Sequence, residues 1–536
     1  MWQVKPDSLY LRQRLIYMVN YGGKSDYRAP SIRQILDSSA SKYGDRTFIK
    51  FIKNGSVEER SFNRLRRDSL TVCRFLRNLG KEKMHIAVAA RTSYEYIVFV
   101  TGILTSGNVL VPFSPETSEK EALSLFKRAD IDIIFYDSAF NCTDKLKKNF
   151  SSVIAPVNII EKGTLDGIIE KYSDSSVYAP LSDYKADIDE CAVIIYTSGT
   201  TGTRKGVMLS MNALVGNIMY DEYVDILNDK AVVLSVLPMY HCYCLSGDYV
   251  RNLKDGLTVC LNGSMRDLPE SLKTFEPTVM RVVPMIAQTL LKMVKAQENR
   301  HRDYTPRQAA EAVYGKNIKW LISGAAYLDP ALVTEYERLG IFLRQGYGMT
   351  EAGCRISVPD ADCSLESVGR VTNMFLTRIQ GGEIQVKGPT LMQGYYKMPE
   401  ETKAAFTEDG WLRTGDIGEV SDSGELFITG RLKNLIILSN GENVSPEAIE
   451  KKFADYDIVS EVLVYSENDR ITADIYPDFG YCSDNDIDDP KDVITAIVKQ
   501  MNEGAKPSHV ITQVRVVNEP LPRTPTGKLL RKKAEI

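Results

Sequence analysis

A loop of glycines, hydroxyl residues and cations is the part of the sequence whose residue types most clearly suggest chemistry. It spans residues 197–205 and contains Gly199, Gly202, Arg204 and Lys205 among threonines and a serine. Glycine lets backbone N–H groups approach an anion closely, hydroxyls donate hydrogen bonds to phosphate oxygens, and the cations add charge. The pattern predicts a phosphate-binding loop, although a polar connection between a strand and a helix has the same composition. It is not a Walker A loop, because Arg204 stands where that loop requires glycine.

Other short motifs follow along the chain, and each has a plain structural explanation when taken alone. A histidine after a strand suits an ordinary loop, glycine brackets suit tight turns, and a basic tail is usually solvated. In order, the motifs are Leu237-Pro-Met-Tyr-His241, Ser323-Gly-Ala-Ala326, Gln345-Gly-Tyr-Gly-Met-Thr-Glu351, Trp411-Leu-Arg-Thr-Gly-Asp416, Gly430-Arg-Leu-Lys433, Ser439-Asn-Gly-Glu-Asn-Val-Ser-Pro446 and Pro522-Arg-Thr-Pro-Thr-Gly-Lys528. Their order carries more information than any single motif.

Together with the loop, these motifs resemble the signature of the adenylate-forming superfamily. That superfamily contains acyl-CoA synthetases, luciferases and the adenylation domains of nonribosomal peptide synthetases. The resemblance runs from about Ile32 to the C-terminus. Residues 388–396 and 436–450 are most similar to the long-chain fatty acyl-CoA synthetase branch, whereas the segment 367–382 is shorter than is usual in that branch.

The resemblance implies a site for ATP. Tyr347 would stack on adenine, and Asp416 with Arg431 would hold the ribose. Thr350 would donate to the α-phosphate, and Glu351 would be the magnesium ligand, since Mg²⁺ prefers hard oxygen donors. The implied nucleotide-binding residues are Thr197, Ser198, Gly199, Thr200, Thr201, Gly202, Lys205, Gly324, Ala325, Gln345, Gly346, Tyr347, Gly348, Thr350, Asp416, Arg431 and Lys528.

The resemblance also implies which residues promote the reaction. Lys528 would lie between the carboxylate of the acid and the α-phosphate, where a cation reduces the repulsion of two anions. The implied catalytic residues are Lys528, Glu351, Thr197, Lys205 and His241.

Three further roles follow from the same resemblance. The acyl pocket would be bordered by Tyr240, His241, Gly324, Ala325 and Ala326. A small C-terminal domain would turn about Lys433, and the pantetheine arm of the thiol substrate would pass Gly441.

Two departures from relatives narrow the chemistry. Amino-acid-activating relatives carry an aspartate near the position of His241, and its absence favours an acid without an α-ammonium group. Some relatives carry a lysine where Ile437 stands, and its absence argues against luciferase-like oxidation.

The implied activity is that of an AMP-forming acid–thiol ligase. Such an enzyme converts a carboxylic acid, here a fatty acid by branch, into acyl-AMP and then into a thioester, using ATP, Mg²⁺ and coenzyme A. The phosphopantetheine of an acyl carrier protein is the alternative acceptor. An adenylate-binding protein without catalysis is a second alternative, while a kinase or P-loop ATPase is disfavoured because neither characteristic loop is present.

Length and composition agree with a multidomain globular protein. The 536 residues exceed one compact core, and the net charge of −4 argues against a dedicated nucleic-acid binder. No apolar run reaches the roughly 18–20 residues of a membrane span. Nine cysteines and an N-terminus without a signal-peptide core predict reduced thiols and a cytoplasmic location. With only four histidines and no Cys-x-x-Cys spacing, a structural zinc site is not expected.

Alternating strands and helices are expected to position the site. Residues 85–90, 109–113 and 131–136 have the pattern of strands, and residues 93–106 and 119–129 between them have the pattern of helices. This alternation predicts βαβ units with a mostly parallel sheet, in which ligands bind beyond the carboxyl ends of the strands.

The phosphate-binding loop is expected to join a strand over 191–195 directly to a helix over 212–220. After Gly381, short strands separated by Gly and Asp turns predict a small antiparallel β unit. We therefore predict an α/β fold with a large N-terminal domain, residues 1–431, built of doubly wound, mostly parallel sheets plus this β unit. A mobile α+β C-terminal domain, residues 432–536, is predicted to follow.

Overall fold

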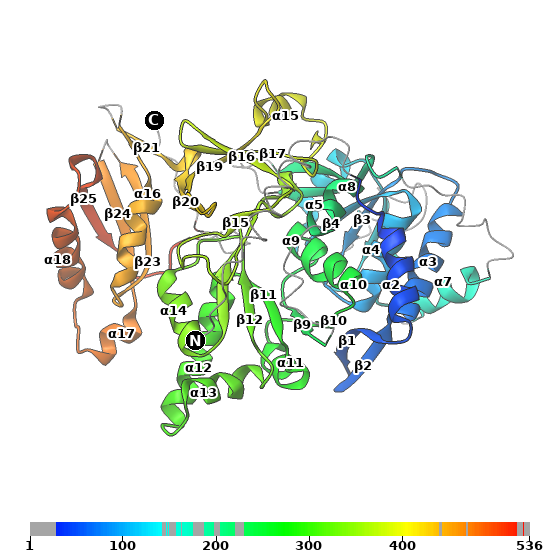
Figure 1. Ribbon diagram of the computed structural model, residues 1–536, viewed down its shortest axis with the longest axis horizontal. Coiled ribbons are helices and arrows are strands. Elements are labelled where there is room, and N and C mark those ends of the chain that lie inside the picture. The colour runs from blue at the N-terminus through cyan, green and yellow to red at the C-terminus, as the bar shows by residue number, and fades with distance from the viewer. Residues whose placement is uncertain are drawn as a thin grey trace.

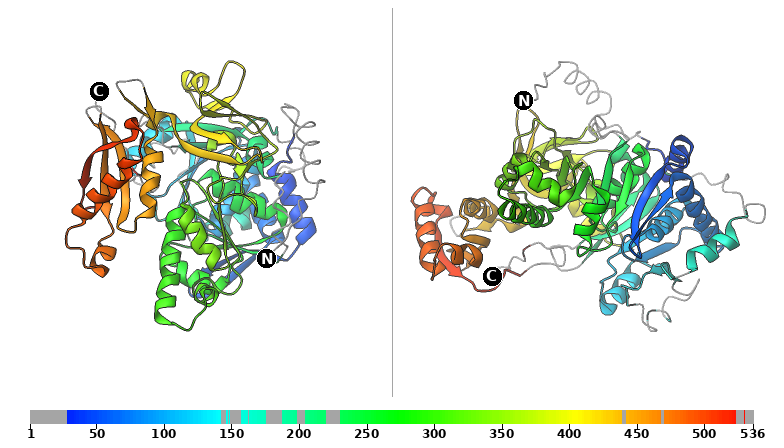
Figure 2. Two further views of the ribbon diagram at one scale, coloured as in Figure 1. Left: turned by 60° about the vertical axis from the view of Figure 1, so that its left-hand side comes forward. Right: turned by 90° about the horizontal axis from the view of Figure 1, so that it is seen from below.

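The computed structural model describes residues 28–141, 146, 148, 157–161, 163–174, 187–197, 204–219, 230–438, 442–467, 470–522 and 529, with only the backbone of Asn443. Figure 1 gives the arrangement of the elements, and Figure 2 shows the same ribbon from two other sides.

Seven strands form the first sheet, in the order β13-β12-β11-β9-β10-β1-β2. Every neighbouring pair is parallel except β1 and β2, which form the only hairpin of this sheet. The short strands β10 and β13 were not predicted from the sequence. The bounds are β1 (Thr47–Lys53), β2 (Ser56–Ser61), β9 (Val232–Ser235), β10 (Thr258–Leu261), β11 (Val279–Val282), β12 (Trp320–Ser323) and β13 (Phe342–Gln345).

The second sheet also has seven strands, in the order β18-β8-β7-β4-β3-β5-β6. The five strands β7, β4, β3, β5 and β6 are parallel, whereas β8 is antiparallel to β7 and β18 is antiparallel to β8. The bounds are β3 (His85–Ala89), β4 (Val109–Phe113), β5 (Ile131–Tyr136), β6 (Val157–Asn158), β7 (Cys191–Thr197), β8 (Lys205–Ser210) and β18 (Gly394–Tyr395).

The strand β8 corrects one prediction about the phosphate-binding loop. Residues 205–210 do not lead directly into a helix but return antiparallel to β7, so the loop joins the two arms of a hairpin. Val207 and Leu209 are fully buried and pair with Ile195 and Val193. This burial holds the segment in the sheet, and helix α8 (Met211–Met219) begins only after the strand has ended.

Helices cover both sheets and fill the space between them. Helix α4 (Tyr94–Ser106) is buried on all sides, and it begins at Ser93, whose hydroxyl accepts a hydrogen bond from the Tyr96 amide at 3.0 Å. Buried residues of both sheets, of α4 and of the helical segment 242–255 form one continuous hydrophobic core. The other helices of this part are α2 (Ile32–Tyr43), α3 (Phe62–Arg77), α5 (Glu119–Arg128), α7 (Thr164–Tyr172), α11 (Leu268–Phe275), α12 (Pro284–Arg300), α13 (Pro306–Tyr314), α14 (Pro330–Arg338) and α15 (Pro399–Ala405).

The helical segment 242–255 changes its winding in the middle. It consists of α9 (Cys242–Cys244), a π-helical turn η3 (Leu245–Val250) and α10 (Arg251–Asp255). Single π-helical turns inside α-helices are rare and occur frequently at functional sites.

The predicted small β unit is present as a four-stranded antiparallel sheet in the order β16-β17-β19-β20. It lies beside the two large sheets (Figure 1). Its strands are β16 (Leu376–Gln380), β17 (Glu383–Lys387), β19 (Leu412–Val420) and β20 (Leu426–Arg431), and the short elements before it are η4 (Thr350–Ala352), β14 (Ser357–Val358) and β15 (Arg370–Val371).

Residues after Arg431 form a smaller α+β unit with a hydrophobic core of its own. It lies at one end of the molecule, opposite helices α2 and α3 (Figure 1). Its elements are η5 (Leu432–Asn434), β21 (Ile436–Ile437), β22 (Asn443–Val444), α16 (Pro446–Glu450), η6 (Lys451–Asp455), β23 (Val459–Glu467), β24 (Arg470–Pro477), α17 (Phe479–Asp484), α18 (Pro490–Glu503), η7 (Pro507–His509) and β25 (Ile511–Val516). The predicted α/β fold, with a large N-terminal part and a smaller C-terminal one, is confirmed.

Candidate active site

Three residues predicted to hold the nucleotide meet around one buried carboxylate. Asp416 on β19 lies opposite Arg431 on β20, and Tyr347 follows β13. Asp416 is 4% exposed; its Oδ2 accepts the Tyr347 hydroxyl at 2.6 Å, and its Oδ1 pairs with the Arg431 Nε at 2.8 Å. Each carboxylate oxygen can accept a second hydrogen bond, so Asp416 is held in place and can still receive ligand hydroxyls.

Tyr347 is more enclosed than its predicted stacking role suggests. Only 9% of the residue is exposed, and burial together with the neighbouring Asp416 carboxylate raises the pKa of its hydroxyl well above the ordinary value. The phenol therefore stays protonated and donates to Asp416. No sequence pattern predicts this bond, because the two residues are 69 positions apart.

A second cluster joins the predicted magnesium ligand to the hairpin. Glu351 lies in η4, and its Oε1 accepts the hydroxyl of Tyr395 at 3.0 Å. The ammonium group of Lys205 lies over the Tyr395 ring, 4.7 Å from its centre. Strand β18 places Tyr395 beside β8, where it pairs with Val207. Tyr395 thus connects Lys205 with Glu351 and was not among the predicted site residues.

The Tyr395 hydroxyl is a donor at physiological pH. Burial, and next the Glu351 carboxylate, raise the pKa of this phenol. No described residue bonds the second carboxylate oxygen of Glu351. A carboxylate is the kind of hard oxygen donor that Mg²⁺ prefers, so Glu351 fits the predicted role of metal ligand.

The two arms of the hairpin place Thr197 opposite Lys205 at the mouth of the loop. Arg204 is directed elsewhere, since its guanidinium pairs with Glu121 of α5 at 2.7 Å. Other predicted residues lie outside the described part of the chain, namely Ser198, Gly199, Thr200, Thr201, Gly202, Gly441 and Lys528.

Gln345 supports a turn that carries three of the predicted site residues. Its side-chain amide donates to the Ala326 carbonyl at 2.9 Å and accepts from the Leu328 amide at 2.9 Å. These bonds hold the turn that follows β12, in which Ala325 has a positive φ of 69°. Gln345 therefore shapes the turn that carries Gly324, Ala325 and Ala326.

Two glycines allow close backbone packing next to Tyr347. The Gly346 amide donates to the Ser323 carbonyl at 2.9 Å. This bond joins the motif of residues 345–351 to the motif of residues 323–326. A side chain at Gly348 would place its Cβ 1.7 Å from the Cys354 carbonyl oxygen. Only glycine fits there, and this packing fixes the turn that leads to Thr350 and Glu351.

The predicted acyl-pocket residues Tyr240 and His241 stand at the start of the segment 242–255. His241 is exposed and precedes the first residue of α9, and its ring centre lies 4.7 Å from that of Tyr240. Burial raises the pKa of the Tyr240 hydroxyl, so that this side chain is a neutral phenol. Lys433, the predicted hinge, is exposed on η5 between the small β unit and the C-terminal unit.

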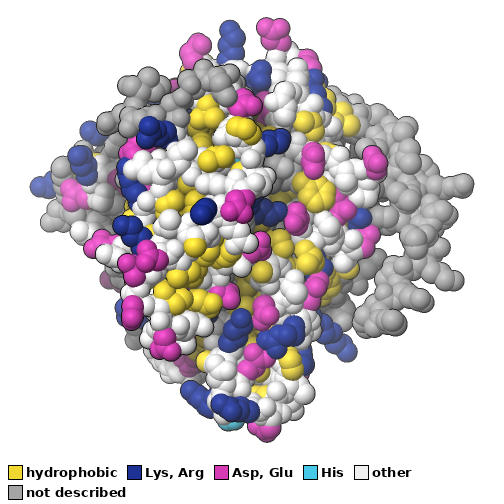
Figure 3. Space-filling model, turned by 90° about the vertical axis from the view of Figure 1, so that its left-hand side faces the viewer, with side chains coloured by type: hydrophobic (Ala, Val, Ile, Leu, Met, Phe, Trp, Pro, Cys, Tyr) yellow, Lys and Arg dark blue, Asp and Glu magenta, His cyan; other side chains and the backbone are white. Residues whose placement is uncertain are grey.

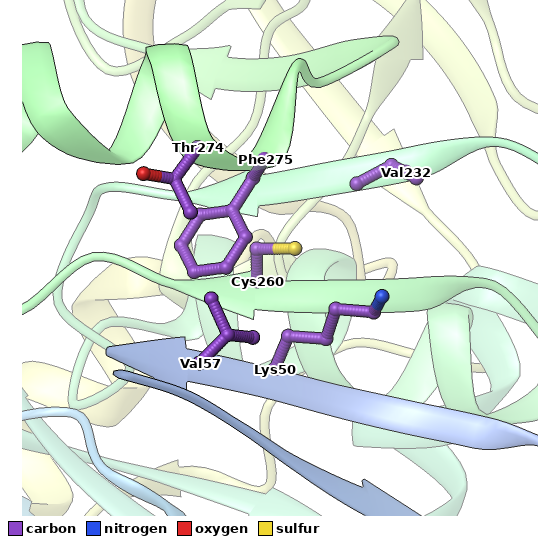
Figure 4. Close-up of a pocket in the computed structure, with 6 residues that line it drawn as sticks. All are labelled: Lys50, Val57, Val232, Cys260, Thr274 and Phe275. Atoms are coloured by element: carbon purple, nitrogen blue, oxygen red, sulfur yellow. The ribbon is translucent and has the colours of Figure 1, made fainter. Parts of the chain in front are cut away.

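Other candidate sites are weaker. A cavity of about 170 Å³ is lined by Lys50, Val57, Val232, Cys260, Thr274 and Phe275 (Figure 4). It is smaller than typical ligand pockets, and no predicted site residue lines it. Among the described residues, the only group of three potential metal ligands is Asp360, Asp362 and Cys363, whose two carboxylates pair with Arg370 at 3.0 and 2.7 Å.

Two further observations concern the surface. On the face shown in Figure 3, lysines and arginines are intermingled with aspartates and glutamates, so this face is not a uniformly basic surface. Among the described residues, no helix is both long and apolar enough to cross a membrane.

Comparison with known families decides the membership of the chain. The model of the AMP-binding enzyme family matches residues 36–396, and that of the AMP-binding enzyme C-terminal domain matches residues 433–536. The chain belongs to the AMP-binding enzyme family. Its resemblance to the adenylate-forming superfamily is thereby confirmed, and the protein is a member of a family of adenylate-forming acid ligases.

The relatives of this AMP-binding enzyme act on different acids and acceptors. It is 26% identical to a chloroplastic long-chain-fatty-acid–[acyl-carrier-protein] ligase of Arabidopsis thaliana, covering 99% of this chain and 88% of that one. It is 26% identical to a long-chain-fatty-acid–CoA ligase of Bacillus subtilis, covering 94% of each. It is 28% identical to 4-coumarate–CoA ligase 3 of Arabidopsis thaliana, covering 83% and 81%.

Among solved structures, the fold is similar to that of ATP-bound MatB from Rhodopseudomonas palustris, with a TM-score of 0.78. The identity is 23%, and the match covers 93% of this chain and 97% of that one. At this identity the likeness establishes the fold.

Proposed function

We propose that this AMP-binding enzyme joins a carboxylic acid to the thiol of coenzyme A through an acyl-AMP intermediate. The observation that carries the proposal is the buried carboxylate of Asp416, which Tyr347 and Arg431 hold in place and whose oxygens each keep a lone pair for a ribose hydroxyl. Relatives that cover most of the chain are named acid–CoA ligases, which supports the same activity.

In the first step the acid carboxylate attacks the α-phosphorus of ATP. A new bond forms between carboxylate oxygen and phosphorus, the bond to the bridging oxygen of the β-phosphate breaks, and pyrophosphate leaves. Phosphoryl transfer depends mostly on positioning and on neutralising charge. Thr197, Lys205 and the loop between them are assigned to the phosphates, Thr350 to the α-phosphate, and Lys528 to the space between carboxylate and phosphate.

Glu351 is the residue assigned to Mg²⁺, which when bound would neutralise phosphate charge. The Tyr395 hydroxyl fixes the orientation of that carboxylate from the protein side. His241 is assigned to the mouth of the acyl pocket, beside the reacting carboxylate.

In the second step the thiol gives up its proton to water, its sulfur bonds to the acyl carbonyl carbon, and AMP leaves with the electrons of the broken acyl–phosphate bond. We infer that the C-terminal domain, residues 432–536, turns about Lys433 against the domain of residues 1–431 between the steps. Gly441 is assigned to the path of the pantetheine arm.

A carrier-protein acceptor is the second candidate, and one relative named as an acyl-carrier-protein ligase favours it. The purified enzyme, given an accepted acid and ATP, is expected to form acyl-CoA with coenzyme A. Loading of a phosphopantetheinylated carrier protein without formation of acyl-CoA would instead support the second candidate. Absence of acid-dependent pyrophosphate release with a broad set of acids would support an adenylate-binding protein without catalysis.

Lys528→Ala tests the assigned chemistry by separating the two steps. Loss of the bridging cation is expected to slow adenylation by about 10²- to 10³-fold, while thioester formation from preformed acyl-AMP stays near that of the wild type. The matched control is Lys506→Ala, which removes an exposed lysine of the same domain and should leave both rates unchanged. Equal loss of both steps in Lys528→Ala would contradict the role.

A further inference from the structure

We propose that the acid is compact, of the size of a short-chain or single-ring aryl acid, and that Tyr243 sets this limit. The proposal rests on the proposed function and adds the class of its substrate. It concerns the space between the two predicted walls of the acyl pocket, which are the start of α9 at Tyr240 and His241 and the turn of Gly324 to Ala326.

Tyr243 crosses from one wall to the other. It lies in α9, two residues after His241, and its hydroxyl donates to the Ile322 carbonyl on β12 at 3.0 Å. A Cβ atom added at Gly324 would come within 3.2 Å of the Tyr243 ring. The ring therefore lies against the backbone of a residue that was predicted to border the acyl pocket.

About one helical turn after Tyr243, the same helical segment carries a buried charged group. Asp248, in the π-helical turn, pairs with Arg281 of β11 at 2.7 Å and accepts the Ser235 hydroxyl at 3.0 Å. Asp248 is fully buried and Arg281 is 5% exposed. The Arg281 side chain is packed against Gly247, where an added Cβ would be 2.9 Å from the arginine Nε.

This arrangement disfavours a long alkyl chain for two reasons. A methylene group contributes to binding only where it leaves water for apolar surroundings, and here the next neighbours are a buried carboxylate and guanidinium. Arg281 also fills the room that Gly247 would otherwise leave open. A flat ring or a short chain can end against the Tyr243 ring without disturbing the ion pair.

Acid-dependent pyrophosphate release by the full-length enzyme tests the proposal, with benzoate, butyrate, octanoate, dodecanoate and palmitate as probe acids. The wild type is expected to have a kcat/KM at least about tenfold higher for benzoate or butyrate than for dodecanoate and palmitate. The ratio between benzoate and butyrate then distinguishes an aryl from a short aliphatic substrate.

Two variants test whether the Tyr243 ring sets the limit on the length of the acid. Tyr243→Ala should raise kcat/KM for octanoate and dodecanoate by about tenfold relative to butyrate, because it opens the space beside Gly324. Tyr243→Phe keeps the ring without the hydroxyl and should keep the length profile of the wild type. Activity on butyrate or benzoate shows that each variant is folded.

The outcomes separate the inference from the proposed function. A wild type that prefers palmitate, or a folded Tyr243→Ala with an unchanged length profile, would overturn the inference and leave the ligase function standing. If Tyr243→Ala does not fold, the smaller change Tyr243→Leu takes its place, and an unchanged length profile in that variant would equally overturn the inference. Failure of every acid to release pyrophosphate would contradict the proposed function itself.

Discussion

Asp416 is held by side chains from two other parts of the chain, and this makes its role testable at the level of one residue. Asp416→Ala removes the proposed ribose acceptor and leaves the Tyr347 hydroxyl and the Arg431 guanidinium without their partner. Loss of hydrogen bonds to a charged group, about 1.5–3 kcal/mol, should weaken ATP binding by about tenfold or more. Isothermal titration with ATP measures this change.

Asp409→Ala is the matched control for Asp416→Ala. Asp409 is also a carboxylate paired with an arginine, Arg378 at 2.6 Å, but its side chain is 57% exposed. Its removal should leave ATP affinity unchanged. An unchanged ATP affinity in Asp416→Ala as well would count against the ribose contact.

At the residue scale, motif order picked out groups that lie close together in the structure, but it did not predict which residues they contact. Tyr347, Asp416 and Arg431 were predicted to serve one ligand, and they do lie together. That Tyr395 would bond Glu351 was not predictable, since 44 residues separate them and only the pairing of β18 with β8 brings them close. Gln345 was predicted to bind the nucleotide, and in the structure its side chain also holds the turn at Ala326.

At the scale of elements, the contact between β18 and β8 can be tested through Tyr395, which this contact places beside Glu351. Tyr395→Phe keeps the ring under Lys205 and removes the hydroxyl that orients Glu351. Loss of a hydrogen-bond partner that orients a metal ligand typically lowers metal affinity by about tenfold or more. The Mg²⁺ concentration for half-maximal pyrophosphate release should therefore rise by about this factor, with the rate at saturating Mg²⁺ close to that of the wild type.

The neighbouring tyrosine supplies the control for Tyr395→Phe. The Tyr396 hydroxyl donates to Asp130 and not to Glu351, so Tyr396→Phe should not change the Mg²⁺ requirement. A fall in the saturated rate of Tyr395→Phe without any change in Mg²⁺ dependence would contradict the positioning role.

Elements with a long, regular pattern were predictable, and short ones were not. Helix α4 and strands β3, β4 and β5 agree with the sequence to within about a residue, because apolar runs and caps such as Ser93 mark them. Strand β8 was missed because Val207, Met208 and Leu209 run directly into the apolar start of α8, so no periodicity separates the two. Pairing with β7 and β18 makes this segment a strand.

The proposed rotation about Lys433 is a property of the whole molecule. Proline fixes φ, so Lys433→Pro should restrict the turning of the C-terminal domain. Thioester formation from preformed acyl-AMP is expected to fall by at least about tenfold more than adenylation does. Lys433→Ala, which leaves the backbone free to turn, is the control and should affect both steps little. A similar loss of both steps in Lys433→Pro would contradict the hinge.

At the scale of the molecule, two units were predictable because strands and turns change character after Gly381 and again after Arg431. How the units meet was not predictable, since it depends on single contacts between them. Lys451 pairs with Glu366 at 3.0 Å, and the Ser445 hydroxyl donates to the Thr429 carbonyl at 3.0 Å. Neither contact has a signature in the sequence.

The edges of the two large sheets have a consequence for behaviour in concentrated solution. An edge strand carries unpaired backbone groups that can pair with another molecule and begin an aggregate. The second sheet ends in β6 and β18, which have two residues each, and the exposed edge strand β2 of the first sheet carries Glu58, Glu59 and Arg60 in succession. Strands this short or this charged are poor templates for intermolecular β-pairing, so these three edges should not begin fibrils in concentrated solution.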